Sequence, residues 1–299
     1  MMGLFTYLRL KITATLLRFM FGMMVGKIVT KQDKIIFIPS REAGRKIKIH
    51  KYGPKSSTAK KPGPVLINFH GSGFMTPLHG TDDEFCHFIV DRTDYTILDG
   101  TYRLAPEHPF PCALEDVQDI ISYVLNHPEE YDKDNISLSG FSAGGNLAFS
   151  ASLTSNFSEG TIRRVIGFYP GLMDMSTDPA QKHAPDSRIN ALPPWILRVF
   201  TECYSYQQSA DVRDPKLSPA FADPKTFGAE EYVVITAAGD RIAPEAEALA
   251  GRMDEAGKKV LMRRIEGVEH GWDKKPKKTE LEGRKMVEAY QVVVDALRG

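Results

Sequence analysis

The sequence contains few cysteines and no excess of charge of either sign. Its 299 residues include three cysteines, Cys86, Cys112 and Cys203, which lie far apart and form no CxxC pair. This set is typical of neither a disulfide framework nor a zinc site, and it indicates a reducing compartment, so we expect a cytoplasmic protein. Thirty-eight Lys and Arg residues balance thirty-eight Asp and Glu residues. Because this balance gives no basic field to attract phosphates, we do not expect a nucleic-acid partner.

Long uninterrupted hydrophobic runs are also missing. The first thirty residues are rich in Leu, Ile, Phe and Met, but Arg9, Lys11, Arg18 and Lys27 interrupt them. A membrane-spanning helix needs about 20 consecutive apolar residues, and no small-residue cleavage site follows a short apolar core, so we expect neither a transmembrane segment nor a signal peptide. The segment is expected to form an apolar helix that packs on the body of the protein or lies on a membrane surface. We favour packing, because no dense cationic face opposes the apolar residues.

The sequence contains no HExxH, P-loop or GxGxxG motif. These motifs bind catalytic zinc, nucleotide phosphates and dinucleotides, so we expect no metal and no cofactor. The chain does contain ample apolar material, since 42% of its residues are hydrophobic and 25% are charged. This composition is sufficient for a sizeable core and excludes a disordered or collagen-like chain.

Apolar runs of strand length alternate with helical patterns along most of the chain. Two short alternating strands at 34–39 and 46–51 indicate an edge hairpin. Further strands are expected at 65–69, 95–98, 136–139, 165–168, 232–236 and 259–265, and helices at 113–125, 143–153, 244–256 and 278–297. Strands that alternate with helices form βαβ units. The sequence therefore predicts an α/β fold, as one domain over residues 1–299, with a mainly parallel central sheet and helices on both faces.

One long stretch, about residues 171–224, breaks this alternation. Pro, Asp and Ser turns surround a helical run that begins near Pro193, and the stretch is too long for an ordinary crossover loop. In open α/β sheets, ligands bind beyond the carboxyl ends of the strands, so an insertion there is placed to cover a site. We expect it to form a helical cap together with about residues 1–30.

Residues 140–144 read Gly-Phe-Ser-Ala-Gly, a GxSxG motif. A serine hydroxyl is a poor nucleophile until a base removes its proton, and a sharp strand-to-helix turn lifts the serine clear of the sheet. Gly- and Ser-rich turns are common, so the five residues alone are weak evidence. This motif, however, directly follows an apolar strand and directly precedes a helical pattern, and that context predicts Ser142 as a nucleophile.

A second motif, His-Gly-Ser-Gly-Phe at residues 70–74, follows the first buried strand. Acyl transfer develops negative charge on a former carbonyl oxygen, and backbone N–H groups aimed at that oxygen stabilise it. Glycines let the backbone approach closely. A flexible loop is the simpler interpretation, but the position upstream of GxSxG is the one expected for an oxyanion loop.

The base and its orienting carboxylate should follow the serine in the order Ser, Asp, His. Asp240 comes just after the strand predicted at 232–236, and His270 comes just after the strand predicted at 259–265. Since the carboxyl ends of parallel strands share one edge of the sheet, both residues could meet Ser142 there. Among eight histidines, His108 is the one serious competitor.

Together these motifs resemble the hormone-sensitive lipase-like α/β-hydrolases. The resemblance covers most of the chain and rests on HGSGF (70–74), YRLAPEHPFP (102–111), GFSAGGNLA (140–148), DPKLSP (214–219) and the positions of Asp240 and His270. It implies the α/β-hydrolase fold with a cap over the active site. It also implies that Ser142 is the nucleophile, that His270 is the general base and then the acid, and that Asp240 fixes the tautomer of His270.

The resemblance further implies an oxyanion hole at Gly71, Ser72, Gly73 and Ala143, in which the last three residues donate their N–H groups. The sequence departs from the family pattern at several positions. Ser72 replaces the middle glycine of HGGGF, and Phe141 stands where an aspartate usually precedes the nucleophile. These changes remove no required functional group, but they bear on substrate preference.

The leading hypothesis is a serine hydrolase that cleaves carboxylic esters of small to medium acyl chain through an acyl-enzyme on Ser142. Its partner would be a small-molecule ester or thioester. Two alternatives remain open: a biosynthetic thioesterase, lactonase or cyclase on the same fold, and a small-molecule binding protein without catalysis. The presence of His270 argues against the binding protein. The sequence leaves open whether the chain forms a homodimer and whether its N-terminal segment touches a membrane.

Overall fold

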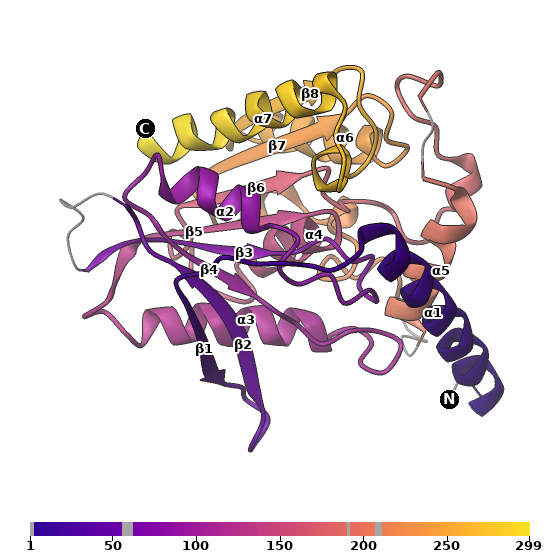
Figure 1. Cartoon of the computed structure of the whole chain (residues 1–299), viewed down its shortest axis with the longest axis horizontal. Helices are drawn as coiled ribbons and strands as arrows, with labels where there is room; N and C mark the ends of the chain where they lie inside the picture. Colours follow the sequence, from indigo (N-terminus) through magenta and orange to yellow (C-terminus); the bar gives the residue numbers. More distant parts are fainter. Residues whose placement is uncertain (1–2, 56–61, 190–191, 207–210) are drawn as a thin grey trace.

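The computed structural model describes residues 3–55, 62–189, 192–206 and 211–299 (Figure 1). In this part of the chain eight strands form one sheet, in the order β1-β2-β4-β3-β5-β6-β7-β8. The strands are β1 (Lys34–Pro39), β2 (Lys46–Tyr52), β3 (Gly63–Phe69), β4 (Thr96–Gly100), β5 (Tyr131–Phe141), β6 (Arg164–Phe168), β7 (Glu231–Ala237) and β8 (Lys259–Ile265). β2 runs antiparallel to both β1 and β4, and all other pairs are parallel. The predicted α/β fold, the mainly parallel sheet and the edge hairpin are confirmed.

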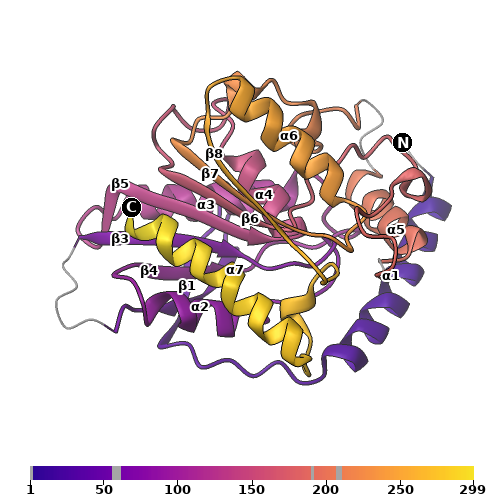
Figure 2. The same ribbon diagram turned by 90° about the horizontal axis from the view of Figure 1, so that it is seen from above.

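Helices cover both faces of the sheet (Figure 2). One layer contains α2 (Asp83–Val90) and α7 (Glu280–Arg298). The other contains α3 (Cys112–Leu125), α4 (Ala143–Ala151) and α6 (Ala243–Glu255). In β3, Val65, Ile67 and Phe69 pack in the layer of α3 and α4, whereas Leu66 packs in the layer of α2 and α7. This two-sided burial explains why the central strands appear in the sequence as continuous apolar runs.

Helix α2, which lies between β3 and β4, was not predicted from the sequence. This helix is eight residues long and buries Phe85, Cys86, Ile89 and Val90 against the sheet and α7. It supplies the crossover that a parallel β3–β4 pair requires. Two helical turns are too short to give a clear period of 3.6 residues, so the pattern alone did not reveal it.

The N-terminal helix α1 (Leu4–Val25) lies beside α5 (Pro194–Ser205), near the carboxyl ends of the parallel strands (Figure 1). It buries only Leu10, Ala14 and Leu17, which form one narrow stripe. The opposite face is open, since Leu4 is 74% and Phe5 is 83% exposed. The expectation that the apolar residues of this segment pack on the body is therefore wrong for most of them, because only the stripe is buried and few others, such as Tyr7 and Phe21, pack against neighbouring residues. No helix among the described residues is long and apolar enough to cross a membrane.

Ion pairs hold α1 against the body. Arg18 binds the carboxylate of Glu107 through two nitrogens, at 2.6 and 2.8 Å, and donates to two backbone carbonyl groups at 2.8 Å. Lys11 pairs with the same carboxylate, and Arg9 pairs with Glu202 of α5 at 2.8 Å. Burial would raise the pKa of Glu107, but hydrogen bonds from Arg18 and Lys11 outweigh it and lower the pKa to about 2. Glu107 therefore stays charged and anchors the helix.

Replacing this anchor should loosen α1. We expect Glu107→Ala to weaken the docking of α1 by about 1–3 kcal/mol, because two cations lose a charge-assisted hydrogen-bond partner. Lys27 directly follows α1 and is exposed, so trypsin should cleave there faster in the variant. The matched control is Glu202→Ala, which removes an exposed pair worth little. Equal rates of cleavage in the wild type and Glu107→Ala would show that this carboxylate does not anchor the helix.

Candidate active site

Ser142 lies in a sharp turn between β5 and α4. Its backbone angles are φ 51° and ψ −114°, a conformation that costs about 1–3 kcal/mol for a residue with a side chain and that clusters at functional sites. The turn is held by the N–H of Ser142, which donates to the carbonyl oxygen of Phe168 at 2.9 Å. A Cβ on Gly140 would lie 2.2 Å from the carbonyl oxygen of Gly144, and one on Gly144 would lie 2.0 Å from that of Phe69. Close backbone approach thus requires both glycines of the motif.

Ser142, His270 and Asp240 form a hydrogen-bonded chain. The Nε2 atom of His270 lies 2.9 Å from the Oγ atom of Ser142, and its Nδ1 atom lies 2.6 Å from Oδ2 of Asp240. The other carboxylate oxygen of Asp240 accepts the N–H of Ile242 at 3.1 Å, which fixes the carboxylate. When Nδ1 carries the proton and donates a hydrogen bond to Asp240, Nε2 is free to accept the proton of the serine hydroxyl.

The environment of His270 favours its protonated form. Burial lowers the pKa of this imidazole, but the charge of Asp240 and the hydrogen bond to it outweigh burial and raise the pKa above its ordinary value. The ring of Tyr169 packs against the imidazole, with 4.7 Å between ring centroids. His270 can therefore accept a proton and remain charged inside the protein.

Asp273 holds this aromatic support in place. The hydroxyl of Tyr169 donates to Oδ1 of Asp273 at 2.6 Å, and that of Tyr290 donates to Oδ2 at 2.8 Å. The sequence analysis did not identify Tyr169 or Asp273. Tyr169 follows the end of β6 in the same way that Asp240 and His270 lie beyond the ends of β7 and β8. Its position after a predicted strand was therefore a signal that it lies near the site.

The side chain of Lys274 is largely buried, with 17% of it exposed. Its Nζ atom is 2.8 Å from Oδ1 of Asp82, 3.1 Å from Oδ2 of Asp273 and 3.4 Å from the ring centroid of Phe141. A run of lysines such as that at 274–278 normally indicates a solvated loop, but these partners enclose the ammonium group of Lys274. Phe141, which departs from the family pattern, provides the aromatic face for the buried ammonium group.

The loop at residues 70–74 lies next to Ser142. Gly73 has φ 55°, and a Cβ there would lie 2.4 Å from the ring of Phe200 in α5. Gly71 is also close to the turn, because a Cβ added at this position would lie 3.3 Å from the carbonyl oxygen of Phe141. Gly71 therefore brings the backbone of the loop close to the serine and Gly73 brings it close to α5, while Ala143 occupies the first turn of α4.

The hydroxyl of Ser72 is held by a neighbouring tyrosine. Tyr102 donates its hydroxyl to the carbonyl oxygen of His70 at 2.7 Å, so the Oγ atom of Ser72, 2.6 Å away, donates to Tyr102. The rings of His70 and Tyr102 also stack, with centroids 4.5 Å apart. The extra hydroxyl at position 72 is therefore used to position the loop.

A cavity of about 300 Å³ opens onto these groups. Gly71, Ser72, Gly73, Ser142 and His270 all line it. Its apolar walls come from α1, from α5 and from the stretch that precedes α5, through Phe21, Met24, Val25, Phe200 and Leu192. The cavity thus joins Ser142 to an apolar space formed by the two segments that lie above the strand ends.

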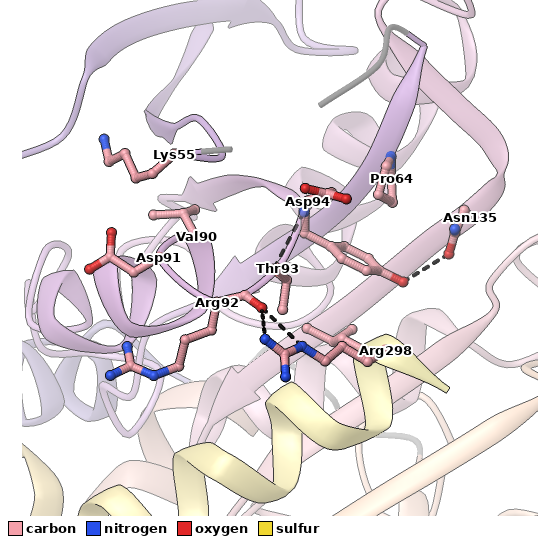
Figure 3. A pocket seen from close by; sticks show the side chains of 11 residues that line it. Lys55, Pro64, Val90, Asp91, Arg92, Thr93, Asp94, Asn135 and Arg298 are labelled. Atoms are coloured by element: carbon pink, nitrogen blue, oxygen red, sulfur yellow. Dashed lines mark hydrogen bonds between the residues drawn. The ribbon is translucent and has the colours of Figure 1, made fainter. Parts of the chain in front are cut away.

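A larger cavity, of about 670 Å³, lies at the opposite ends of the strands (Figure 3). It is lined by polar residues such as Arg92, Asp94 and Asn135, and Arg298 of α7 closes one side by donating to the carbonyl oxygen of Arg92. It contains no serine or histidine among its lining residues. The smaller cavity is therefore the candidate active site, although it is not the largest.

Among the described residues, His50, His79 and Asp99 could offer ligand atoms to a metal ion. Donor atoms of His50, His79 and Asp99 lie within 4.8 Å of one another. His79 Nε2 lies 3.0 Å from the carbonyl oxygen and 3.3 Å from Oδ2 of Asp99, and Asn68 donates to Oδ1. The His50 and His79 rings lie 4.1 Å apart between centroids and tilt by 39°, so they face each other instead of a shared ion. We assign this buried group a supporting role.

Glu245, a carboxylate close to Asp240 in the sequence, and His108, the competing histidine, take no part in the hydrogen-bonded chain. Glu245, in α6, pairs with Lys182 at 2.5 Å and accepts the N–H of Asp174 at 3.3 Å. His108 is exposed in the turn that precedes α3. Asp240 and His270 are the carboxylate and the imidazole that the structure brings to Ser142.

Comparison with known proteins gives consistent matches. Residues 66–274 match a family described as having the α/β-hydrolase fold. An arylesterase of Saccharolobus solfataricus is 25% identical over 213 residues, covering 70% of this chain and 68% of that protein. A probable carboxylesterase 3 of Arabidopsis thaliana is 25% identical over 228 residues, covering 73% and 71%. A solved hyperthermophilic esterase from Pyrobaculum calidifontis has a TM-score of 0.78 and 25% identity, covering 96% and 92%.

The pKa of His270 provides a direct test of this geometry. In the wild type it should lie above 6.5, and in Asp240→Asn it should fall, because burial remains while the main stabilising charge is lost. Titration of the imidazole nitrogens by NMR measures both values. Glu245→Gln is the matched control and should leave the titration unchanged. An unaltered pKa in Asp240→Asn would contradict the assigned pairing.

Proposed function

Because the chain belongs to the hormone-sensitive lipase-like α/β-hydrolase family, we propose that it is a serine hydrolase that cleaves carboxylic esters through an acyl-enzyme on Ser142. The observation that carries this proposal is the hydrogen-bonded chain from Ser142 through His270 to Asp240. Its relatives include proteins named as arylesterase and carboxylesterase. The fold alone would not establish the chemistry, but the site supports it.

The geometry supports a two-step reaction. Ser142 Oγ attacks the ester carbonyl carbon while His270 Nε2 takes its proton, and the carbonyl electrons move to the oxygen. His270 then donates the proton to the departing alcohol, which leaves an acyl group on Ser142. In the second step, water attacks the acyl carbon while His270 takes its proton. Return of that proton to Ser142 releases the carboxylic acid. Asp240 keeps the other imidazole nitrogen protonated throughout.

We assign the oxyanion hole to the loop and the helix start beside the serine. Gly71 brings the loop close to the nucleophile, and the N–H groups of Ser72, Gly73 and Ala143 would donate to the developing negative oxygen. The support for this assignment is that the loop residues line the same cavity as Ser142, and that Tyr102 holds Ser72 in place. Each such donor is worth about 2.7–4 kcal/mol of transition-state stabilisation.

We further propose that the chain is one catalytic domain over 1–299, in which α1 and the stretch 171–224 form the cap. Residues 190–191 and 207–210 of that stretch lie outside the described residues. The support is that α1 and α5 lie side by side and supply the apolar walls of the cavity. A volume of about 300 Å³ suits a small to medium acyl chain. The three free cysteines are consistent with the cytoplasmic location expected from the sequence.

Substitution of the reacting groups tests the proposal. Ser142→Ala and His270→Ala should each lower the turnover of a soluble short-chain p-nitrophenyl ester by about a thousandfold or more without unfolding the protein. The double variant should be hardly slower than either single variant, because the two groups act as one unit. Steady-state kinetics measure the turnover, and circular dichroism shows whether the variants are folded.

His108→Ala serves as the matched control, since it removes an exposed imidazole of the same type and should retain normal turnover. The assignment of the base fails if His108→Ala loses activity while His270→Ala keeps it. If the folded wild type hydrolyses no ester or thioester, the proposal of a binding protein on this fold replaces that of an enzyme.

A further inference from the structure

The polarity of α1 is reversed relative to that of an ordinary surface helix. Six large apolar side chains point away from the body, and we call them the outer face of α1: Phe5, Leu8, Ile12, Leu16, Phe19 and Met23. They are between 47% and 83% exposed. The helix has 22 residues and is thus about 33 Å long, so the outer face forms a continuous apolar strip along one side of the molecule. Contiguous exposed apolar patches on this scale mark interaction sites.

The charges of α1 are all paired with the protein, although Arg9 remains 52% exposed. Its basic residues are Arg9, Lys11 and Arg18, each paired with a carboxylate of the body, and the helix contains no acidic residue. A helix that faces water normally presents its charged side chains outward and its apolar side chains inward. Here the ion pairs fix the helix in an orientation that leaves the uncharged side exposed.

The outer face continues to the mouth of the active-site cavity. Met24 is 69% exposed and also lines the cavity, together with Phe21 and Val25 of the same helix. Lys275 and Pro276 line the cavity as well. The apolar strip and the entrance to Ser142 therefore form one surface, and whatever covers the strip lies next to the entrance.

Exposed cations flank this surface. Lys27 follows α1, and Lys277 follows the cavity residue Pro276. Both are exposed, and neither forms an ion pair with the described residues. An apolar strip bordered by free ammonium groups matches the chemistry of a membrane surface, where acyl chains lie beneath anionic headgroups.

We propose that the outer face of α1 docks the protein on a lipid surface that carries anionic headgroups. The side chains of the face enter the acyl boundary, while Lys27 and Lys277 contact headgroups. If the proposed ester hydrolysis is correct, lipophilic esters then enter the cavity directly from the lipid phase. This uptake of esters rests on the proposed function, whereas the docking does not.

The breadth of the apolar surface favours lipid over a second copy of the chain. At 100° per residue around the helix axis, the exposed apolar side chains between Leu4 and Met24 span an arc of about 200°, whereas a two-helix seam uses a narrower stripe. A second copy seated on the strip would also cover the cavity entrance at Met24, which a substrate must pass. A lipid surface leaves that entrance open to lipophilic molecules.

The experiment is co-sedimentation of the full chain with phosphatidylcholine vesicles, prepared with and without phosphatidylserine. The wild type should pellet with vesicles, and more strongly when phosphatidylserine is present. The double variant Ile12→Glu/Phe19→Glu should bind about tenfold more weakly or worse, because it places charge in the acyl boundary. Phe37→Glu is the matched control: it introduces the same charge at a 61% exposed phenylalanine of β1, and it should bind as the wild type does.

Turnover of a soluble short-chain ester should be the same in all these proteins, since none of the substituted residues lines the cavity. This readout shows that the variants are folded and separates the docking from the proposed function. Absence of pelleting by the wild type, or equal pelleting of the double variant, overturns the proposal. The proposal is also overturned if the wild type binds no vesicles and forms a dimer in analytical ultracentrifugation that Ile12→Glu/Phe19→Glu converts to a monomer.

Discussion

The active site depends on the close approach of two backbone segments, the end of β3 and the turn between β5 and α4. No side chain fits at Gly144, because a Cβ there would lie 2.0 Å from the carbonyl oxygen of Phe69. This contact places the loop that follows Phe69 directly beside Ser142. The neighbouring parallel strands β7 and β8 end at the same edge and bring Asp240 and His270 to the serine. The positions of Ser142, Asp240 and His270 thus follow from the way that the parallel strands of the sheet pack and end.

Much of the fold could be predicted because its determinants are local. Strands buried on both faces appear as continuous apolar runs, and those runs located the central strands of the sheet. The errors arose where tertiary contacts decide the outcome. The helix α2 has only two turns, too few for a clear period. The sequence of α1 is apolar on all sides, so it could not show that ion pairs with Glu107 and Glu202 fix which side faces the body.

The sequence could bring Ser142, Asp240 and His270 together from chain order and strand ends, and the structure joins them by hydrogen bonds, whereas the residues around them could not be predicted. Ser142, Asp240 and His270 each lie in or beyond the end of a predicted strand. In contrast, Nζ of Lys274 lies 2.8 Å from Oδ1 of Asp82, although the two residues are far apart in sequence. A run of lysines normally indicates a solvated loop, so the sequence did not predict this contact. A buried ammonium group requires specific partners, and only the packed structure shows that Asp82 and Asp273 provide them.

The central claim, that Ser142 is a nucleophile activated by His270, is tested most directly by a fluorophosphonate probe. Such a probe forms a covalent bond with an activated serine hydroxyl and not with an ordinary one. Peptide mapping by mass spectrometry should locate the label at Ser142, and labelling should be lost in His270→Ala, where the hydroxyl remains but its base is absent. A folded wild-type protein that stays unlabelled, or that is labelled equally in His270→Ala, would contradict the account.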